Sequence, residues 1–133
     1  MQRCPIARSG RAGSAGSLAD LLVDSDVLID HLRGARALRR PPGSTLSCSV
    51  ISRCELLAGP KSQEEPVRAL LASLRELPVD PDVATAAGLI RRETGIATPD
   101  ALIAATALRA GLDLMTRNRS DFERVEGLRI AAL

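Results

Sequence analysis

The stretch Leu-Leu-Val-Asp-Ser-Asp-Val-Leu-Ile, residues 21–29, decides the fold of this chain. Its first three residues form an apolar run that is typical of a short buried strand. The apolar residues that follow favour a helix, which Ser25 or Asp26 can cap and which Gly34 can end. Asp24 therefore lies between two elements that are largely buried, where a carboxylate needs partners to offset the loss of its hydration.

The rest of the chain alternates between strand-like and helix-like segments. Further strands are predicted at residues 45–50, 77–79, 112–116 and 128–130. Helices are predicted to begin near Ser52, Glu64, Asp82 and Thr98. Such alternation implies an α/β fold: a three-layer α/β/α sandwich with a central, mostly parallel sheet.

Two of these helix starts rest on particular capping patterns. Ser52-Arg53-Cys54-Glu55 matches a capping box, in which the serine and the glutamate satisfy the first free N–H groups of a helix. Thr98-Pro99-Asp100 has Thr as the cap, Pro at the first helical position and an acid in the first turn. Residues 21–133 are thus expected to form one domain, preceded by a flexible extension over residues 1–20.

Four acidic residues lie where these elements begin or end. Asp24 follows the first predicted strand and Glu55 lies just beyond the second, whereas Asp121 follows the strand that ends near Thr116. Asp100 opens a helix. Because ligands of a parallel sheet bind outside the carboxyl ends of its strands, we expect the four acids to face one rim. Like charges gathered in one buried place require a cation or uptake of protons.

These candidate ligands are all oxygen atoms, which suits Mg²⁺ or Mn²⁺ better than Zn²⁺. One or two such ions polarise a phosphodiester and lower the pKa of a bound water. His31 is the only histidine, so acid–base catalysis by a pair of histidines is excluded. Hydrolysis that depends on a metal is the chemistry that remains.

Composition restricts the partners and the compartment. Phe122 is the only aromatic residue, which disfavours nucleic-acid binding through stacked aromatic rings. The net charge is +2, and nearly all the cationic residues are arginines, which suit phosphate recognition. Three cysteines without metal-ligand spacing fit a reducing cytoplasm. No segment is long enough to span a membrane, so we expect no membrane partner.

Each acid also has a purely structural interpretation. Glu55 can be no more than the capping-box partner of Ser52, Asp100 an acid favoured by the helix dipole, and Asp121 an ordinary loop residue. Asp24 is the hardest to explain structurally because of the apolar runs on both sides of it. Arginines near the end of the first helix and around Asn118 are solvated, or contact phosphate or a protein partner: Arg33, Arg36, Arg117 and Arg119.

Taken in order, four segments resemble a PIN-domain ribonuclease, and within that family the VapC toxins of bacterial toxin–antitoxin pairs. These are Leu-Leu-Val-Asp-Ser-Asp-Val-Leu-Ile (21–29), Ile-Ser-Arg-Cys-Glu-Leu-Leu-Ala-Gly (51–59), Pro-Asp-Ala-Leu-Ile-Ala-Ala-Thr-Ala (99–107) and Thr-Arg-Asn-Arg-Ser-Asp-Phe (116–122). The resemblance extends over nearly everything from Leu21 to the end of the chain.

The resemblance implies an endoribonuclease in which Asp24, Glu55, Asp100 and a fourth acid, Asp121, hold Mg²⁺ (or Mn²⁺) and catalyse cleavage. It also implies supporting roles for Ser25, Asp26, Thr116 and Asn118. Water would attack the RNA phosphodiester and leave 5′-phosphate and 3′-hydroxyl ends. The expected partners are RNA, a cognate VapB-type antitoxin that blocks the site, and a second copy of the chain in a homodimer.

One position departs from the family pattern, and two other functions remain open. Many relatives carry an acid where this chain has Asn118, so either Asp121 takes the fourth place or Asn118 is a neutral ligand. Asp24 and Asp26 also resemble the first motif of haloacid-dehalogenase-type phosphatases, although the later motifs of that family are absent. The third function is a catalytically weak PIN-type module that binds RNA or protein.

Overall fold

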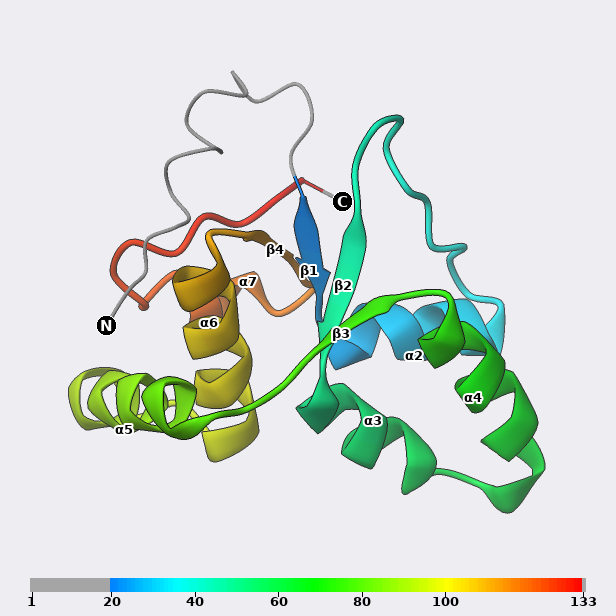
Figure 1. Ribbon diagram of the computed structural model, residues 1–133, viewed down its shortest axis with the longest axis horizontal. Helices are drawn as coiled ribbons and strands as arrows, with labels where there is room; N and C mark the ends of the chain where they lie inside the picture. The colour runs from blue at the N-terminus through cyan, green and yellow to red at the C-terminus, as the bar shows by residue number, and fades with distance from the viewer. Residues whose placement is uncertain (1–19, 133) are drawn as a thin grey trace.

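A four-stranded, all-parallel sheet in the order β3-β2-β1-β4 forms the centre of the computed structural model, which describes residues 20–132 (Figure 1). The predicted extension over residues 1–20 lies almost entirely outside the described residues. The strands are β1 Leu21–Val23, β2 Leu46–Ser49, β3 Arg75–Leu77 and β4 Asp113–Met115. The predicted α/β fold with a parallel central sheet is confirmed.

Helices connect the parallel strands and cover both faces of the sheet. They are α2 Ser25–Arg33, α3 Val50–Leu57, the short 3-10 helix η2 Lys61–Gln63, α4 Glu64–Ala72, α5 Pro81–Thr94, α6 Thr98–Ala110 and α7 Arg119–Phe122. In Figure 1, α5 and α6 lie on one side of the sheet, and α2, α3 and α4 lie on the other. No helix within residues 20–132 is long and apolar enough to cross a membrane.

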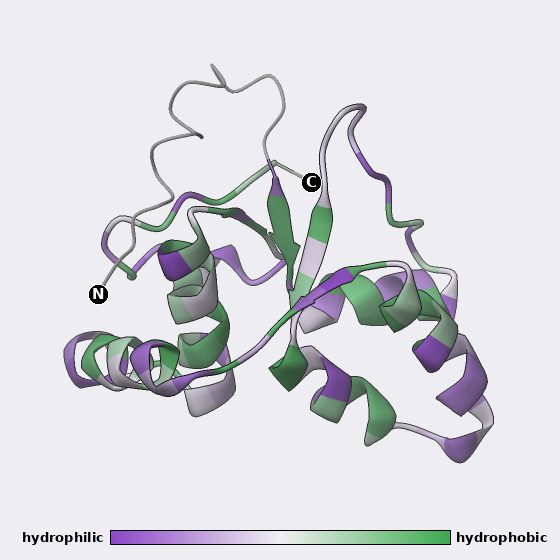
Figure 2. Ribbon diagram, in the orientation of Figure 1, coloured by the Kyte–Doolittle hydropathy of each residue, from purple (hydrophilic) through white to green (hydrophobic). Residues whose placement is uncertain are grey.

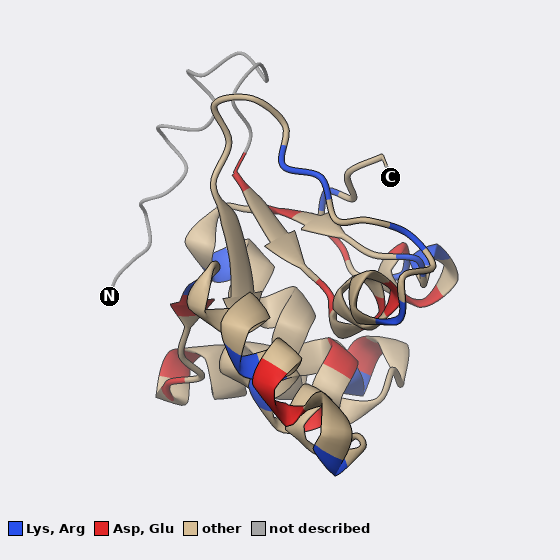
Figure 3. Cartoon of the chain, turned by 90° about the vertical axis from the view of Figure 1, so that its right-hand side faces the viewer, with Lys and Arg blue, Asp and Glu red and all other residues tan. Residues whose placement is uncertain are grey.

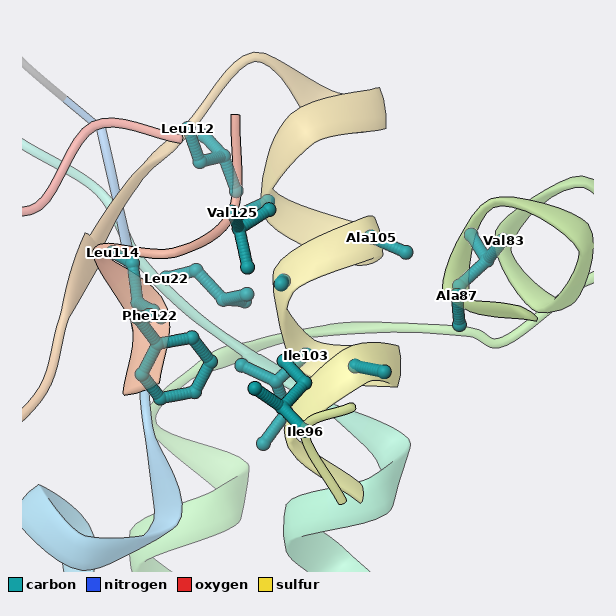
Figure 4. Close-up of a cluster of buried hydrophobic side chains, with 13 residues drawn as sticks. Leu22, Val83, Ala87, Ile96, Ile103, Ala105, Leu112, Leu114, Phe122 and Val125 are labelled. Carbon is teal, nitrogen blue, oxygen red and sulfur yellow. The ribbon is translucent and has the colours of Figure 1, made fainter. Parts of the chain in front are cut away.

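Alternate residues of β1 face two separate apolar cores. Leu22 belongs to the core formed with α5, α6, α7 and β4, in which Phe122 and Leu114 are fully buried (Figure 4). Leu21 and Val23 belong to the opposite core, formed with α2, α3 and α4. This alternation follows from the two-residue period of a strand, and it leaves both faces of β1 apolar (Figure 2).

The helix boundaries correct three sequence predictions. Asp24 itself caps α2, since its side chain accepts from the backbone N–H of Ser25. Ser49 caps α3, so Ser52 lies inside that helix and the predicted capping box is wrong. Thr98 is the first residue of α6 rather than its cap. In each case the chain enters the helix earlier than the sequence signal indicates.

The helix ends agree better with the sequence. Gly34 and Gly111 end α2 and α6 with φ angles of 75° and 70°, in the left-handed region that glycine adopts without strain. The predicted last strand at residues 128–130 is reduced to one parallel bridge between Leu114 and Ile130.

The central strand β2 carries a fully buried hydroxyl without a partner. Ser47 is 0% exposed, and among the buried side chains of the described residues its Oγ alone makes no hydrogen bond. A buried polar group without a partner costs about 1–3 kcal/mol of stability. By contrast, the neighbouring hydroxyl of Ser49 caps α3 by accepting from the N–H of Ile51 at 3.0 Å.

We therefore expect Ser47→Ala to raise the free energy of unfolding by about 1 kcal/mol, because it removes an unsatisfied hydroxyl. Ser49→Ala, the matched control, should lower that free energy by about 1 kcal/mol because α3 loses its cap. Urea unfolding followed by circular dichroism measures both. A destabilised Ser47→Ala protein would show that the hydroxyl has a partner, such as a buried water.

Candidate active site

Asp24 occupies the carboxyl end of β1, directly before α2. Its carboxylate is 5% exposed and accepts two hydrogen bonds, one on each oxygen. The backbone N–H of Ser25 donates to Oδ1 at 2.8 Å, and the hydroxyl of Thr116 donates to Oδ2 at 2.7 Å. Thr116 follows β4, the parallel neighbour of β1, so two adjacent strand ends hold this carboxylate.

The surroundings of Asp24 favour its protonated form. The pKa of its carboxyl is raised from 3.8 to about 7, mainly by burial and also by the negative charges of Asp26 and Asp100, against the lowering effect of the hydrogen bonds from Thr116 and Ser25. A carboxyl group at the end of a buried strand thus titrates near neutrality. Such a group is a candidate for function when other acids face it.

Asp100 brings more carboxylates into the same electrostatic field. It lies in the first turn of α6, where burial raises the pKa of its carboxyl and the charges of Asp121, Glu55 and Asp26 raise it further. The four acids predicted from the sequence, together with Asp26, therefore repel one another across the end of the sheet. They come from the β1–α2 junction, α3, α6 and α7.

Glu55 is held by a chain of hydroxyl groups. Ser25 donates to its Oε1 at 2.5 Å, and the oxygens of Ser25 and Ser52 are 2.7 Å apart. Because the proton of Ser25 goes to the carboxylate, the fully buried Ser52 hydroxyl donates to Ser25. The interpretation of Glu55 as a capping residue is thus wrong, since its side chain points back toward α2.

Asp26 and Asn118 fill the space around the Thr116 hydroxyl. The backbone N–H of Arg117 donates to Asp26 at 3.2 Å, and the N–H of Asn118 donates to Oγ1 of Thr116 at 3.0 Å. The side-chain amide of Asn118 donates to Oδ2 of Asp121 at 3.1 Å. The loop after β4 therefore orients three acids through its own polar groups.

The arginines predicted to contact RNA or a partner divide into two groups. Arg117 pairs with Asp30 at 3.1 Å, and Arg36 lies in the loop after α2, close to it. Arg119 pairs instead with Glu123, one helical turn away, at 3.4 Å. Arg33 is exposed on the last turn of α2. Figure 3, turned by 90° from Figure 1, marks the positions of Lys and Arg in blue and those of Asp and Glu in red.

Two residues of the site were missed from the sequence. Ser52 was interpreted as a helix cap, yet its buried hydroxyl supports Ser25. Asp30 was not among the candidate residues, yet its side chain is only 14% exposed and pairs with Arg117. Asp30 lies three residues after the buried Val27 on α2, and this helical spacing could have indicated that Asp30 faces the same side of the helix.

The donor chemistry fits a hard divalent cation. Every candidate ligand is a carboxylate, amide or hydroxyl oxygen, and Mg²⁺ needs only one or two carboxylates because it keeps several waters. Within residues 20–132, no group of three or more Asp, Glu, His or Cys side chains lies where it could hold a metal ion as the side chains stand.

The raised pKa of Asp24 predicts a pH dependence of stability in metal-free protein. Between pH 4 and pH 7 the folded state holds a proton that the unfolded chain has released, so the free energy of unfolding falls as the pH rises through this range. The fall should reach about 4 kcal/mol, since each pKa unit corresponds to about 1.4 kcal/mol. Urea unfolding with chelator at several pH values measures it.

Asp24→Asn should remove most of this fall, because the amide does not titrate. Glu126→Gln changes an exposed acid and should leave the fall unchanged. Parallel pH profiles for the wild type and Asp24→Asn would contradict the assignment of the raised pKa to Asp24.

Comparison with known proteins agrees with this geometry. The sequence model of the PIN domain matches residues 21–128. Ribonuclease VapC10 of Mycobacterium tuberculosis is 42% identical over 121 residues, which cover 82% of this chain and 90% of the relative. Ribonuclease VapC19 of the same organism is 33% identical, with coverage of 76% and 90%.

Solved structures show the same fold. A toxin–antitoxin complex from Klebsiella pneumoniae has a TM-score of 0.68 at 34% identity, covering 81% of this chain and 94% of that one. DNA-bound VapBC from Salmonella typhimurium has a TM-score of 0.73 at 24% identity, with coverage of 86% and 98%. The chain therefore belongs to the PIN-domain family, and the relatives that it matches over most of its length are VapC ribonucleases.

Proposed function

We propose that this protein is a divalent-metal-dependent endoribonuclease and the toxin of a VapBC-type toxin–antitoxin pair. The single observation that carries the proposal is the buried Asp24 carboxyl, with a pKa of about 7, facing Asp26 and Asp100 at the end of the sheet. The ribonuclease names of relatives with 42% and 33% identity support the same activity. The toxin–antitoxin complex of the 34% identical neighbour supports an antitoxin partner.

In this proposal Asp24, Glu55, Asp100 and Asp121 hold Mg²⁺, for which Mn²⁺ can substitute. When bound, the ion would polarise the RNA phosphodiester and lower the pKa of the attacking water. The Ser25 N–H and the Thr116 hydroxyl each hold one oxygen of Asp24, and the Ser25 hydroxyl holds Oε1 of Glu55. These hydrogen bonds fix the direction of the carboxylates before any ligand arrives.

Asp26 takes a positioning role because it accepts from the backbone of Arg117. That bond ties the loop after β4 to α2, and so keeps Thr116 against Asp24. Membership of the PIN-domain family favours this role over that of the general acid in a dehalogenase-type phosphatase. A homodimer that binds one or more VapB-type antitoxins is part of the same proposal.

Cleavage of end-labelled cellular RNA by the purified protein tests the activity. We expect cuts that bear 5′-phosphate with Mg²⁺ or Mn²⁺ and none with chelator. Asp24→Ala and Asp100→Ala should each lower the rate at least about a hundredfold, because a metal contributes several kcal/mol to the barrier. Glu126→Gln, an exposed acid, serves as the control and should cut normally.

The outcomes separate the remaining functions. RNA binding without cleavage in the wild type, unchanged in both alanine variants, would contradict a nuclease and favour a binding module. Phosphatase activity on small phosphomonoesters, without RNA cleavage, would favour the dehalogenase-type function built on Asp24 and Asp26.

Asn118 provides a second test of the metal site. Asn118→Asp adds a charged ligand but replaces the donor that now contacts Asp121 at 3.1 Å. We therefore expect a lower melting temperature in chelator, from added repulsion, and a larger rise in that temperature on adding Mn²⁺. Asn118→Ala loses the same hydrogen bond without adding charge, and should show only the first effect. Equal responses to Mn²⁺ in both variants would contradict a site near residue 118.

A further inference from the structure

A pocket of about 320 Å³ lies beside the acidic site, between α2, the loop that follows it and the end of β4. Its apolar wall comes from Val27 on α2, Leu38 in the loop and Met115 at the end of β4. The volume is within the range of small-ligand sites, about 300–1,000 Å³. Three elements far apart in the sequence thus build a hollow large enough for one flat ring.

The loop that closes this pocket is held in place by hydrogen bonds. The backbone N–H of Leu38 donates to Nδ1 of His31 at 2.9 Å. The N–H groups of Ala35 and Arg36 donate to the carbonyl of Asp30 at 2.9 and 3.4 Å. Leu38 also packs against the core formed with α2, α3 and α4. The pocket is therefore a preformed feature rather than a gap under an unattached loop.

Charged groups of both signs surround the apolar wall. Arg36, Arg39 and Arg117 line the pocket, and all three are exposed. The side chain of Asp30 is 14% exposed, and its Oδ2 lies 3.1 Å from Nε of Arg117. Among the described residues the other oxygen of Asp30 accepts no hydrogen bond. The pocket thus offers cations for an anion, an apolar surface, and one acceptor oxygen on Asp30 for an N–H donor.

Arg117 joins this pocket to the acidic site. Its side chain pairs with Asp30, and its backbone N–H donates to Asp26 at 3.2 Å. The preceding residue, Thr116, donates to Asp24 at 2.7 Å. The segment Thr116–Arg117 therefore contacts both the acidic site and the pocket.

We propose that the pocket binds the base of an unpaired nucleotide of the RNA, next to the phosphodiester that is cut. This inference rests on the proposed ribonuclease function. The base lies on Val27, Leu38 and Met115, and the free oxygen of Asp30 accepts from an exocyclic amino group, as carboxylates do with cytosine N4. Arg36 and Arg39 contact the adjoining phosphates.

An acidic peptide is the other class of occupant that three arginines attract. Asp30 opposes it, because a nearly buried carboxylate repels a second one. The same carboxylate favours cytosine, which has an amino group at N4, over uracil, which has the carbonyl oxygen O4 at that position. The charge pattern therefore selects RNA over an acidic segment.

Fluorescence anisotropy with 5′-labelled rC10 and rU10, in chelator so that no cleavage occurs, tests the proposal. We expect the wild type to bind rC10 about tenfold more tightly, as one well-placed hydrogen bond provides. Asp30→Asn should reduce this preference to about twofold or less, because an amide can donate as well as accept. Arg39→Ala should weaken the binding of both RNAs by the same factor. It should also reduce the slope of log affinity against log salt concentration by about one.

Arg92→Ala is the matched control, since it removes an exposed arginine on α5 that does not line the pocket. The proposal is overturned if rC10 and rU10 bind equally, or if Arg39→Ala behaves as Arg92→Ala does. It is also overturned if Arg39→Ala weakens binding only of a labelled poly-glutamate peptide, which would make the pocket a protein site. A preference for rC10 in a protein that cuts no RNA would support the pocket and refute the nuclease.

Discussion

The burial of the Asp24 carboxyl is the constraint on which the rest of the site depends. The strand β1 is the interior strand whose two faces both meet apolar cores, so the residue at its end enters a region of low polarity. Among residues 20–132, only two hydrogen-bond donors reach this group, one from Ser25 and one from Thr116. They do not offset burial, and the pKa stays near 7. In the proposed function, a divalent cation bound at these acids would remove this deficit.

The fold brings other polar and acidic side chains to the buried Asp24 carboxyl. Parallel pairing brings the ends of β1 and β4 together, so Thr116 meets Asp24 although 92 positions separate them. Helices α3 and α6 then present Glu55 and Asp100 to the same place, as the effect of the Glu55 charge on the pKa of Asp100 indicates. Hydroxyl and backbone groups orient Asp24, Asp26 and Glu55. Asp121 also pairs with Arg124 at 3.5 Å.

Much of this could be predicted from the sequence, because the strands are short, apolar and separated by clear helix signals. The four acids could be predicted from their places at strand and helix ends. The capping pattern at Ser52 was misleading, since Ser49 already satisfies the N-terminus of α3 and leaves Ser52 free to support Ser25. The pocket at Asp30 could not be predicted, because it depends on how a loop without periodicity folds back onto α2 through His31. Long-range hydrogen bonds of this kind leave no local pattern.

Isothermal titration of the metal-free protein with Mn²⁺ at pH 7, repeated in buffers of different ionisation enthalpy, tests the central claim most directly. If the ion binds at a buried Asp24 whose pKa is about 7, binding must expel the proton that about half of the molecules hold there. The account predicts release of about half a proton per ion, and loss of that release in Asp24→Asn. Binding of Mn²⁺ without proton release, or equal binding by Asp24→Asn, would contradict it.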